Sequence, residues 1–127
     1  MRTWRPSPAW SDQRGDITDL LDDVSIRHVG LISSKAGSVR GNHIHQKADR
    51  YTFVVKGTLE YYERMPDQLD VSKAILSAGD MVFTPAGAAL AVRFVEDSVI
   101  LELNTEPRSN GRYEQELVRL AVPLVSP

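Results

Sequence analysis

The chain has 127 residues and a formal net charge of -2 at pH 7, with acidic and basic residues interspersed. No basic face or polybasic run is present, so we expect neither nucleic-acid nor membrane binding. The absence of cysteine excludes disulfides, thiolate metal sites and a cysteine nucleophile, and the length predicts a single domain, 1–127.

The first sixteen residues, MRTWRPSPAWSDQRGD, contain two prolines and two tryptophans but no continuous apolar stretch. Signal peptides and transmembrane helices need such a stretch, so we expect neither here and expect a cytoplasmic protein. Trp4 and Trp10 are large apolar side chains in a segment with little structure of its own. We expect them, with the outward strand positions Phe53 and Val55, to cover a subunit interface in a homodimer.

Most of the remaining chain consists of short runs rich in β-branched and aromatic residues, such as VSIRHVGLIS, RYTFVVKG and SVILELN, separated by turn signals. This rhythm predicts an all-β sandwich or barrel. A helix is an alternative for ITDLLDD and for YEQELVRL, and strand is favoured for the second. The residues expected in the barrel core are Val54, Leu59, Val82, Leu90, Val92 and Phe94.

The stretch GSVRGNHIHQKADRYTFVVKG, residues 37–57, contains two of the three histidines of the chain, His43 and His45. Residues two apart on an extended strand point to the same side, so both imidazoles converge on one point inside a barrel or cleft. Arg50 follows five residues later. The pair is typical of a metal site, provided that other residues supply the remaining ligands.

This stretch resembles the first motif of the cupins, which is glycine, five residues, His-x-His, a glutamate and a second glycine. Gly37, His43, His45 and Gly57 fit the spacing, while Arg50 stands at the place of the glutamate. The resemblance implies a double-stranded β-helix, or jelly-roll barrel.

The second cupin motif is matched in the same partial way by GDMVFTPAGAAL, within residues 79–94. Gly79, Pro85 and Gly87 fit, and Leu90 stands where the family has a histidine. Both missing residues are metal ligands in the family.

A narrower resemblance is to the small cupins of nucleotide-sugar metabolism, the 3,4-ketoisomerases and 3,5-epimerases, which act without a metal. It is carried by DQRGDITDL, by SSKAGSVRGNHIH and by FVEDSVILELNTEPR. The likeness places Arg40 and His43 on an RG-x-H element and His28 on an earlier inward-facing strand position. Where the epimerases have a late tyrosine, Glu102 is the nearest ionisable group.

The charge of Arg50 bears on the choice between metal binding and proton transfer. A fixed positive charge beside a dication is repulsive by several kcal/mol at an effective dielectric constant of about 20, so no metal cofactor is favoured. If a divalent metal does bind, His43 and His45 are its expected ligands.

Proton transfer is the alternative use of the pair. A neutral histidine suits a general base that removes a proton next to a ketone, and an arginine can stabilise the enolate or hold a diphosphate. The expected base is His43, with Arg50 or Arg40 as the cation and His45, Tyr61 or Glu102 as the proton donor.

The leading hypothesis is therefore a cupin that isomerises or epimerises a keto sugar nucleotide by metal-independent proton transfer. The expected catalytic residues are His43, His45 and Arg50, and the expected substrate-binding residues are Arg40, His28, Tyr61 and Glu102. Two alternatives remain open, a non-catalytic cupin that binds a small molecule and a metal-dependent cupin enzyme. Whether a proton donor stands opposite His43 separates the catalytic from the binding hypothesis.

Overall fold

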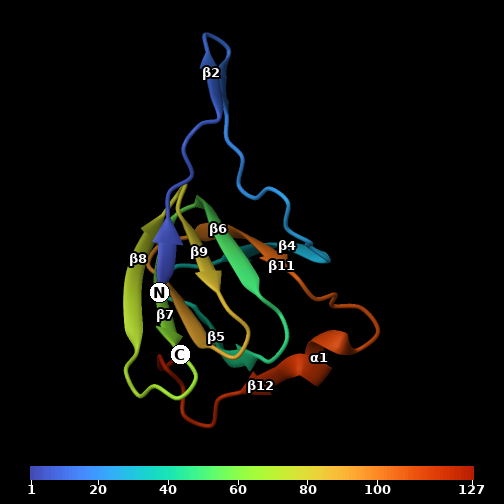
Figure 1. Cartoon of the computed structure of the whole chain (residues 1–127). Coiled ribbons are helices and arrows are strands. Elements are labelled where there is room, and N and C mark those ends of the chain that lie inside the picture. Colours follow the sequence, from blue (N-terminus) through green and yellow to red (C-terminus); the bar gives the residue numbers. More distant parts are fainter.

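The computed structural model describes all 127 residues, and strands make up almost all of its regular structure (Figure 1). The elements are β1 (Arg2–Trp4), β2 (Trp10–Asp12), β3 (Gly15–Ile17), β4 (His28–Ser34), β5 (Val39–His45), β6 (Arg50–Lys56), β7 (Thr58–Arg64), β8 (Ser72–Ser77), β9 (Met81–Thr84), β10 (Ala89–Phe94), β11 (Ser98–Asn104), α1 (Arg112–Glu116) and β12 (Leu117–Arg119). The predicted all-β class is confirmed.

Two five-stranded antiparallel sheets form the barrel. The strand order is β1-β9-β6-β11-β4 in the first sheet and β12-β5-β10-β7-β8 in the second. Successive strands change sheets, from β4 to β5 and from β6 to β7, so the chain winds around one enclosed core (Figure 1). This is the jelly-roll arrangement that the two motifs predicted.

The core lies between the inner faces of the two sheets. All six residues predicted for the core are buried and belong to one apolar cluster, which also contains Tyr61, Leu76 and Ile100. Burying a side chain of this size stabilises the fold by about 1.5–3 kcal/mol relative to leaving it exposed. The cluster therefore supplies most of the driving force that closes the barrel.

The two helical alternatives have different outcomes. ITDLLDD contains no helix, and only its first residue, Ile17, belongs to β3. YEQELVRL is divided, because its first half forms α1 and Leu117–Arg119 form β12. The strand prediction was wrong for that first half. Gly111, with φ of 74°, turns the chain ahead of the helix, and pairing with the edge of β5 then draws the following residues into a strand.

Residues 5–27 form an arm that projects from the barrel and carries the β2–β3 hairpin (Figure 1). Trp10, on this hairpin, is 60% exposed, while Trp4, on β1, is partly covered. The arm leaves from β1 and returns at β4, so both of its roots are edge strands of the first sheet.

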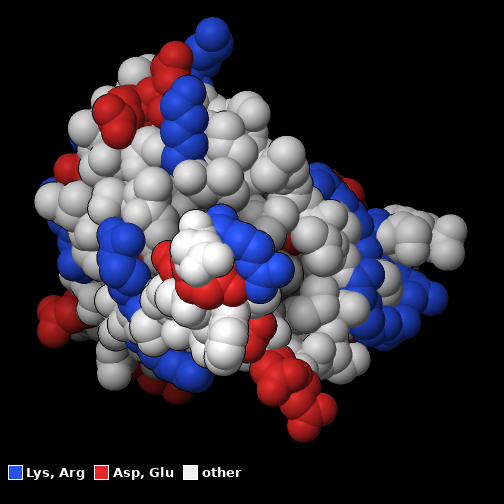
Figure 2. Space-filling view, turned by 90° about the horizontal axis from the view of Figure 1, so that it is seen from above, with Lys and Arg blue, Asp and Glu red and all other residues white.

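The surface carries charges of both signs. Acidic and basic side chains are interspersed over most of the face seen from above, with basic side chains gathered toward the side on which α1 lies (Figures 1 and 2). The chain has no helix with the length and apolar character needed to cross a membrane.

Candidate active site

A bulge in β5 aims the RG-x-H element into the barrel. In the pairing of β5 with β10, His43 lies opposite Leu90 and Arg40 opposite Val92, and the register shifts between them at Asn42. Because residues directly opposite each other share a face, the extra residue lets Arg40 and His43, three positions apart, both point inward. Asn42 has φ of 58°, a conformation that asparagine tolerates better than most residues.

Gly41 is required beside this bulge. It has φ of 87°, and a Cβ atom there would lie 2.9 Å from the carbonyl oxygen of Leu90. Any larger residue would push β5 away from β10 and displace His43. The glycine of the RG-x-H element therefore has a steric role in placing the histidine.

These side chains meet at a cavity of about 330 Å³ inside the barrel. Its apolar wall includes Ile32, Leu90, Val92, Phe94 and Ile100. Its polar and charged lining consists of Arg40, His43, Arg50, Glu102, Arg108, Tyr113 and Arg119. Four arginines against one carboxylate make the cavity electropositive, which favours an anionic ligand.

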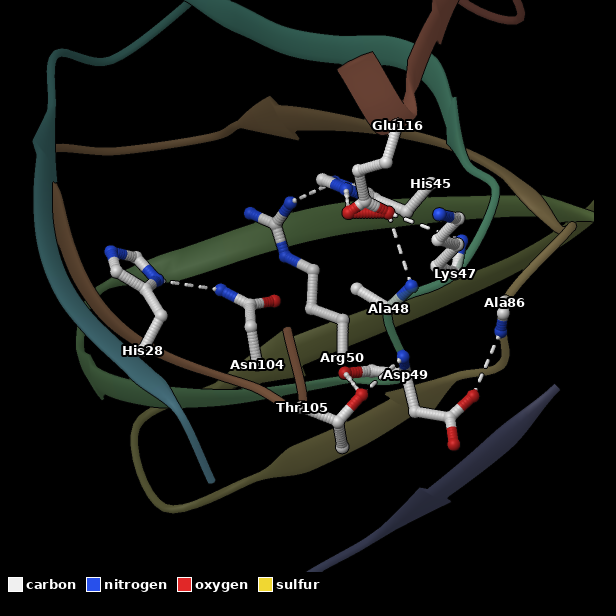
Figure 3. Close-up of polar contacts among 10 residues, drawn as sticks. All are labelled: His28, His45, Lys47, Ala48, Asp49, Arg50, Ala86, Asn104, Thr105 and Glu116. Carbon is white, nitrogen blue, oxygen red and sulfur yellow. Dashed lines mark hydrogen bonds and ion pairs between the residues drawn. The ribbon is translucent and has the colours of Figure 1, made fainter. Parts of the chain in front are cut away.

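Arg50 lies at the centre of the polar network, with its side chain running along the barrel interior toward His45 (Figure 3). It is 9% exposed, forms an ion pair with Glu102, and its Nη1 donates a hydrogen bond of 3.0 Å to Nε2 of His45. Burial lowers the pKa of Arg50. An arginine nevertheless starts so far above neutrality that it keeps its charge.

The contact with Arg50 determines the tautomer of His45. A guanidinium has no acceptor, so Nε2 of His45 accepts the bond and the ring proton resides on Nδ1. Nδ1 lies 3.5 Å from Oε2 of Glu116, whose Oε1 accepts the backbone N–H groups of Lys47 and Ala48 at 3.2 and 3.0 Å. Burial, and next the charge of Arg50, lower the pKa of His45 to about 4, so the imidazole is neutral, with Nε2 bonded to Arg50 and Nδ1 buried without a hydrogen-bond partner.

Nε2 of His43 has no hydrogen-bond partner in the protein, unlike Nε2 of His45, which accepts from Arg50. Its ring stands edge-on to that of His45, with centroids 4.8 Å apart and an interplanar angle of 85°. Burial, and then the charges of His45, Arg50 and Arg119, lower the pKa of His43 to about 3. The side chain that lines the cavity is thus a neutral imidazole with an unused nitrogen.

The structure brings Arg40 and Glu102 to the same cavity. Arg40 is held along one edge, where Nε donates to Oγ of Ser34 at 2.8 Å and Nη2 to the carbonyl oxygen of Ser33 at 3.1 Å. Glu102 accepts the ion pair of Arg50 and is 5% exposed. Arg40 therefore keeps part of its guanidinium available to a ligand, whereas Glu102 is occupied.

Tyr61 and His28 do not line this cavity. Tyr61 belongs to the apolar cluster, and its hydroxyl is hydrogen-bonded to Thr84. His28 lies in a smaller neighbouring recess, which Arg108 and Tyr113 also line, and its Nδ1 is 2.9 Å from Nδ2 of Asn104 (Figure 3). Their expected roles in substrate binding or proton donation have no support from these positions.

The C-terminal segment supplies residues that sequence reasoning missed. Strand β12 pairs with β5, so that Leu117 lies opposite His45 and Arg119 opposite His43, and α1 adds Tyr113 and Glu116. The helical spacing of Tyr113 was a signal for α1. No local pattern, however, indicates that this segment returns beside the histidine strand.

A side chain of β5 clamps the end of the chain. Asn42 donates from Nδ2 to the carbonyl oxygen of Val125 at 3.0 Å and accepts the N–H of Leu124 at 2.8 Å. The bulge residue that orients His43 thus also fixes the segment that carries Tyr113 and Arg119.

The arrangement does not fit a metal centre. No group of three histidine, cysteine, aspartate or glutamate side chains is placed to hold an ion. Arg50 directs an N–H group at His45, Leu90 is apolar, and the Asp49 carboxylate accepts the N–H of Ala86 at 3.0 Å. Both vacated cupin ligand positions are therefore filled by groups that repel or cannot bind a cation.

Comparison with known proteins shows the fold. No family profile and no curated protein matches the sequence. Among solved structures, the sugar 3,4-ketoisomerase QdtA from Thermoanaerobacterium thermosaccharolyticum in complex with TDP has a TM-score of 0.77 and 16% identity, covering 94% of this chain and 88% of that one. The dTDP-4-dehydrorhamnose 3,5-epimerase from Sulfolobus tokodaii has a TM-score of 0.73 and 20% identity, covering 91% and 73%.

A third match is to part of a longer protein. The capsular polysaccharide assembling protein CapF from Staphylococcus aureus has a TM-score of 0.68 and 22% identity over 87% of this chain, which spans 33% of CapF. The architecture is thus that of the cupin barrels found in sugar ketoisomerases and epimerases, as the RG-x-H element suggested. A shared scaffold does not by itself establish a shared reaction.

Proposed function

We propose that the protein is a metal-independent isomerase or epimerase that transfers a proton on a keto sugar nucleotide, with His43 as the general base. The observation that supports this most is the neutral imidazole of His43, with an unpartnered nitrogen, on a cavity lined by four arginines. The fold is shared with sugar ketoisomerases and epimerases, which agrees with the proposal.

The proposed step breaks the C–H bond next to the ketone. His43 takes the proton and becomes an imidazolium, while the electron pair of the bond forms the enolate and the negative charge moves to the ketone oxygen. Arg50, whose Nη1 lies 3.0 Å from Nε2 of His45, is the cation that stabilises that charge. Return of the proton to the opposite face of the same carbon completes epimerisation. In isomerisation, the enolate oxygen takes a proton, the former carbonyl carbon takes another, and the hydroxyl on the deprotonated carbon loses its proton to become the new ketone.

Tyr113 is the proton donor that fits this scheme best. It lines the cavity, its ring centroid lies 5.8 Å from that of His45, and the guanidinium of Arg108 lies 4.3 Å from its own ring centroid. Tyr113 replaces the three donors expected from the sequence, because Tyr61 does not line the cavity and His45 and Glu102 are both bonded to Arg50.

The nucleotide diphosphate is assigned to the remaining arginines of the cavity. Arg40, Arg108 and Arg119 each carry a planar fork that matches phosphate oxygens. The neighbouring ketoisomerase QdtA was crystallised with TDP and, as a variant, with TDP-4-keto-6-deoxyglucose, which supports a ligand of this class. We also propose that the protein is a homodimer.

One observation favours a second candidate, a module that binds the same ligand without turning it over. A base with a pKa of about 3 takes up a proton poorly near neutral pH, where general bases work best. A bound diphosphate would offset the charges of the nearby arginines and raise that pKa. The two candidates therefore differ in what happens once the nucleotide is bound.

The substitution His43→Asn distinguishes them. With TDP-4-keto-6-deoxyglucose as the probe, we expect turnover to fall by ~10²- to 10⁴-fold, the usual contribution of a positioned general base, while the dissociation constant of TDP stays within a few-fold. His28→Asn, the same change outside the cavity, is the matched control and should leave turnover within a few-fold. No turnover by the unaltered protein, with TDP binding weakened by His43→Asn, would favour the binding module.

A further inference from the structure

Strand β12 is short and is held in its sheet by a single neighbour. It comprises Leu117–Arg119, lies at the edge of the second sheet and pairs only with β5. A strand of three residues forms few backbone hydrogen bonds, so pairing alone specifies its register weakly. The register nevertheless decides which side chains of β12 face the cavity.

The sequence of β12 does not by itself select one register. Leu117 and Val118 are adjacent and both apolar, so either could face the barrel interior. In the observed register Arg119 lies opposite His43, and both Leu117 and Arg119 line the cavity. Successive side chains of a strand point to opposite faces, so a shift by one residue would turn Arg119 away and bring Val118 inward. The register therefore decides whether the cavity contains its fourth arginine.

Asn42 of β5 holds the chain directly after β12. From β12 the chain passes beneath the barrel to its C-terminus in the view of Figure 1. The carbonyl oxygen of Asn42 accepts the N–H of Leu120 at 2.9 Å. Its Oδ1 accepts the N–H groups of Leu124 and Val125 at 2.8 and 3.3 Å, and its Nδ2 donates to the carbonyl oxygen of Val125 at 3.0 Å. One residue thus hydrogen-bonds both ends of the segment that follows β12, residues 120–125.

The bulge in β5 leaves Asn42 free to make these contacts. Strand β10 pairs with His43 and then with Gly41, so Asn42 has no paired residue on β10. Its φ of 58° is tolerated by asparagine, aspartate and glycine. Of these three, only asparagine has both an acceptor for the two N–H groups and a donor for the carbonyl oxygen. The residue that suits the bulge therefore also suits the C-terminal segment.

The chain ahead of β12 is held by a separate contact. Glu116 accepts the N–H groups of Lys47 and Ala48 at 3.2 and 3.0 Å, whereas Asn42 holds the chain after the strand. Val125 is 7% exposed, so its side chain is buried in addition to its backbone bonds. With both ends held, β12 cannot shift by one residue unless one of these contacts breaks.

An ion pair of β12 contributes less to its position. Nη1 of Arg119 lies 3.1 Å from Oε2 of Glu114, but the two side chains are 68% and 62% exposed. Exposed ion pairs of this kind add little stability. The place of β12 therefore depends mainly on the contacts of Glu116 and Asn42.

We propose that Asn42 is a positioning residue that fixes the register of β12 and so holds Arg119 opposite His43 on the cavity. Asn42 does not line the cavity itself and therefore acts through β12. Its effect on ligand binding and turnover rests on the proposed function, in which Arg119 binds the diphosphate and His43 is the base. The fixed register is a property of the fold and can be measured without a substrate.

Three substitutions separate the contacts of the Asn42 side chain from the bulge. Asn42→Gly keeps the φ that the bulge needs and removes the bonds to Leu124 and Val125. Asn42→Asp keeps the acceptor and loses the donor, so it should restore part of the function. The matched control is Arg93→Met, which removes another side-chain bond to the end of the chain, from Nη2 of Arg93 to the carbonyl oxygen of Ser126 at 3.2 Å.

Hydrogen exchange measures the fixed register without a substrate. In Asn42→Gly we expect the amide groups of residues 117–120 to exchange about ten-fold faster than in the unaltered protein, because β12 then opens locally at a lower cost. The rates should be intermediate in Asn42→Asp and unchanged in Arg93→Met. Amide groups of β7, in the interior of the same sheet, are the internal reference and should be unchanged in every variant.

Binding of TDP tests whether the register places Arg119. We expect the dissociation constant of TDP to rise about ten-fold in Asn42→Gly and in Arg119→Met, the usual cost of losing a hydrogen bond to a charged group. The double variant should bind TDP no more weakly than either single one, because both changes remove the same guanidinium. With TDP-4-keto-6-deoxyglucose, KM should rise by a similar factor in Asn42→Gly while kcat stays within a few-fold, since the bulge still places His43.

Effects on TDP binding that add in the double variant, or a dissociation constant that Asn42→Gly leaves unchanged, would overturn the role of Asn42. Equal exchange rates of residues 117–120 in Asn42→Gly and in the unaltered protein would overturn the fixed register itself. Absence of TDP binding and of turnover in the unaltered protein would instead contradict the proposed function, and the exchange rates would still test the register.

Discussion

The two halves of the barrel interior are built on the same strands and buried to a similar depth, but they are held together by different forces. Along β6 the inward positions change from Val54 through Thr52 to Arg50, and along β11 from Ile100 to Glu102 and Asn104. The first half is stabilised by removing apolar surface from water. The second buries charges, which costs stability unless every charge finds a partner.

This difference separates what holds the fold from what performs the chemistry. A barrel of this size could fill both halves with apolar residues, and paired buried charges are often no more stabilising than such a filling. Buried polar groups that break this local rule are expected at functional sites. The apolar half therefore serves stability, and the polar half is assigned to proton transfer.

The largest effect on stability is expected in the apolar half. Leu59 is fully buried and does not line the cavity, so Leu59→Ala should leave a void and lower the free energy of unfolding by about 2–5 kcal/mol. Turnover measured below the unfolding transition should stay within a few-fold. Urea denaturation followed by tryptophan fluorescence gives the first quantity. A loss of activity at full occupancy of the folded state would show that the two halves are not separable.

In the polar half, stability should be recoverable while activity is not. Arg50→Met leaves the Glu102 carboxylate buried without its cation. We expect the free energy of unfolding to fall by about 3–5 kcal/mol, because a buried charge without a partner is costly. The double variant Arg50→Met/Glu102→Gln removes both charges and should recover most of that stability in urea denaturation, yet remain inactive. If the double variant were active, Arg50 would have no part in stabilising the enolate.

The two buried histidines, His43 and His45, make the stability of the protein depend on pH. Burial lowers the pKa of His43 to about 3 and that of His45 to about 4, below the ordinary value of 6.5 that applies when the chain is unfolded. Below pH 6.5 the unfolded chain therefore binds more protons, and stability falls as the pH falls toward 4. Each histidine lowers the free energy of unfolding by up to about 1.4 kcal/mol for each pH unit in this range.

Urea denaturation at pH 7.5 and at pH 5 measures that slope. Carboxylates also titrate at low pH, so the useful quantity is the difference between the unaltered protein and variants. His43→Asn and His45→Asn should each flatten the dependence, whereas His28→Asn should flatten it less. Identical slopes in all four proteins would contradict the assigned burial of the histidine pair.

The smallest expected effect is that of removing metal. Because Arg50 donates to His45 and Leu90 occupies the second vacated ligand position, the purified protein should contain well under one equivalent of transition metal. Elemental analysis before and after a mild chelator wash measures this. Stoichiometric iron, zinc, nickel or manganese that survives the wash would reverse the assignment of His43 and His45.

The fold could be predicted from the sequence because the patterns that indicate it are local. Glycine and proline at fixed spacing define the turns of the two motifs, and strand alternation selects inward residues such as Val54 and Phe94. The position of His43 followed from the same logic. The core and the histidine strand were therefore predicted together.

The rest of the site depends on contacts that no local pattern reports. Alternation predicts that Tyr61 points inward, but not how far along the barrel it lies, and it falls among the apolar residues. Tyr113 and Arg119 reach the cavity because the C-terminal segment pairs with β5, more than seventy positions away in the sequence. Such long-range pairing is decided by the closed barrel and not by the segment itself.

Deuterium exchange tests the central claim most directly. The protein is incubated in deuterium oxide with TDP-4-keto-6-deoxyglucose, and the sugar is examined by mass spectrometry and NMR. We expect deuterium on a carbon next to the ketone, because the proton taken by His43 exchanges with solvent before it returns, and we expect His43→Asn to abolish the label. Binding of the nucleotide sugar without any incorporation of deuterium would contradict proton transfer and leave His43 as a residue that only shapes the cavity.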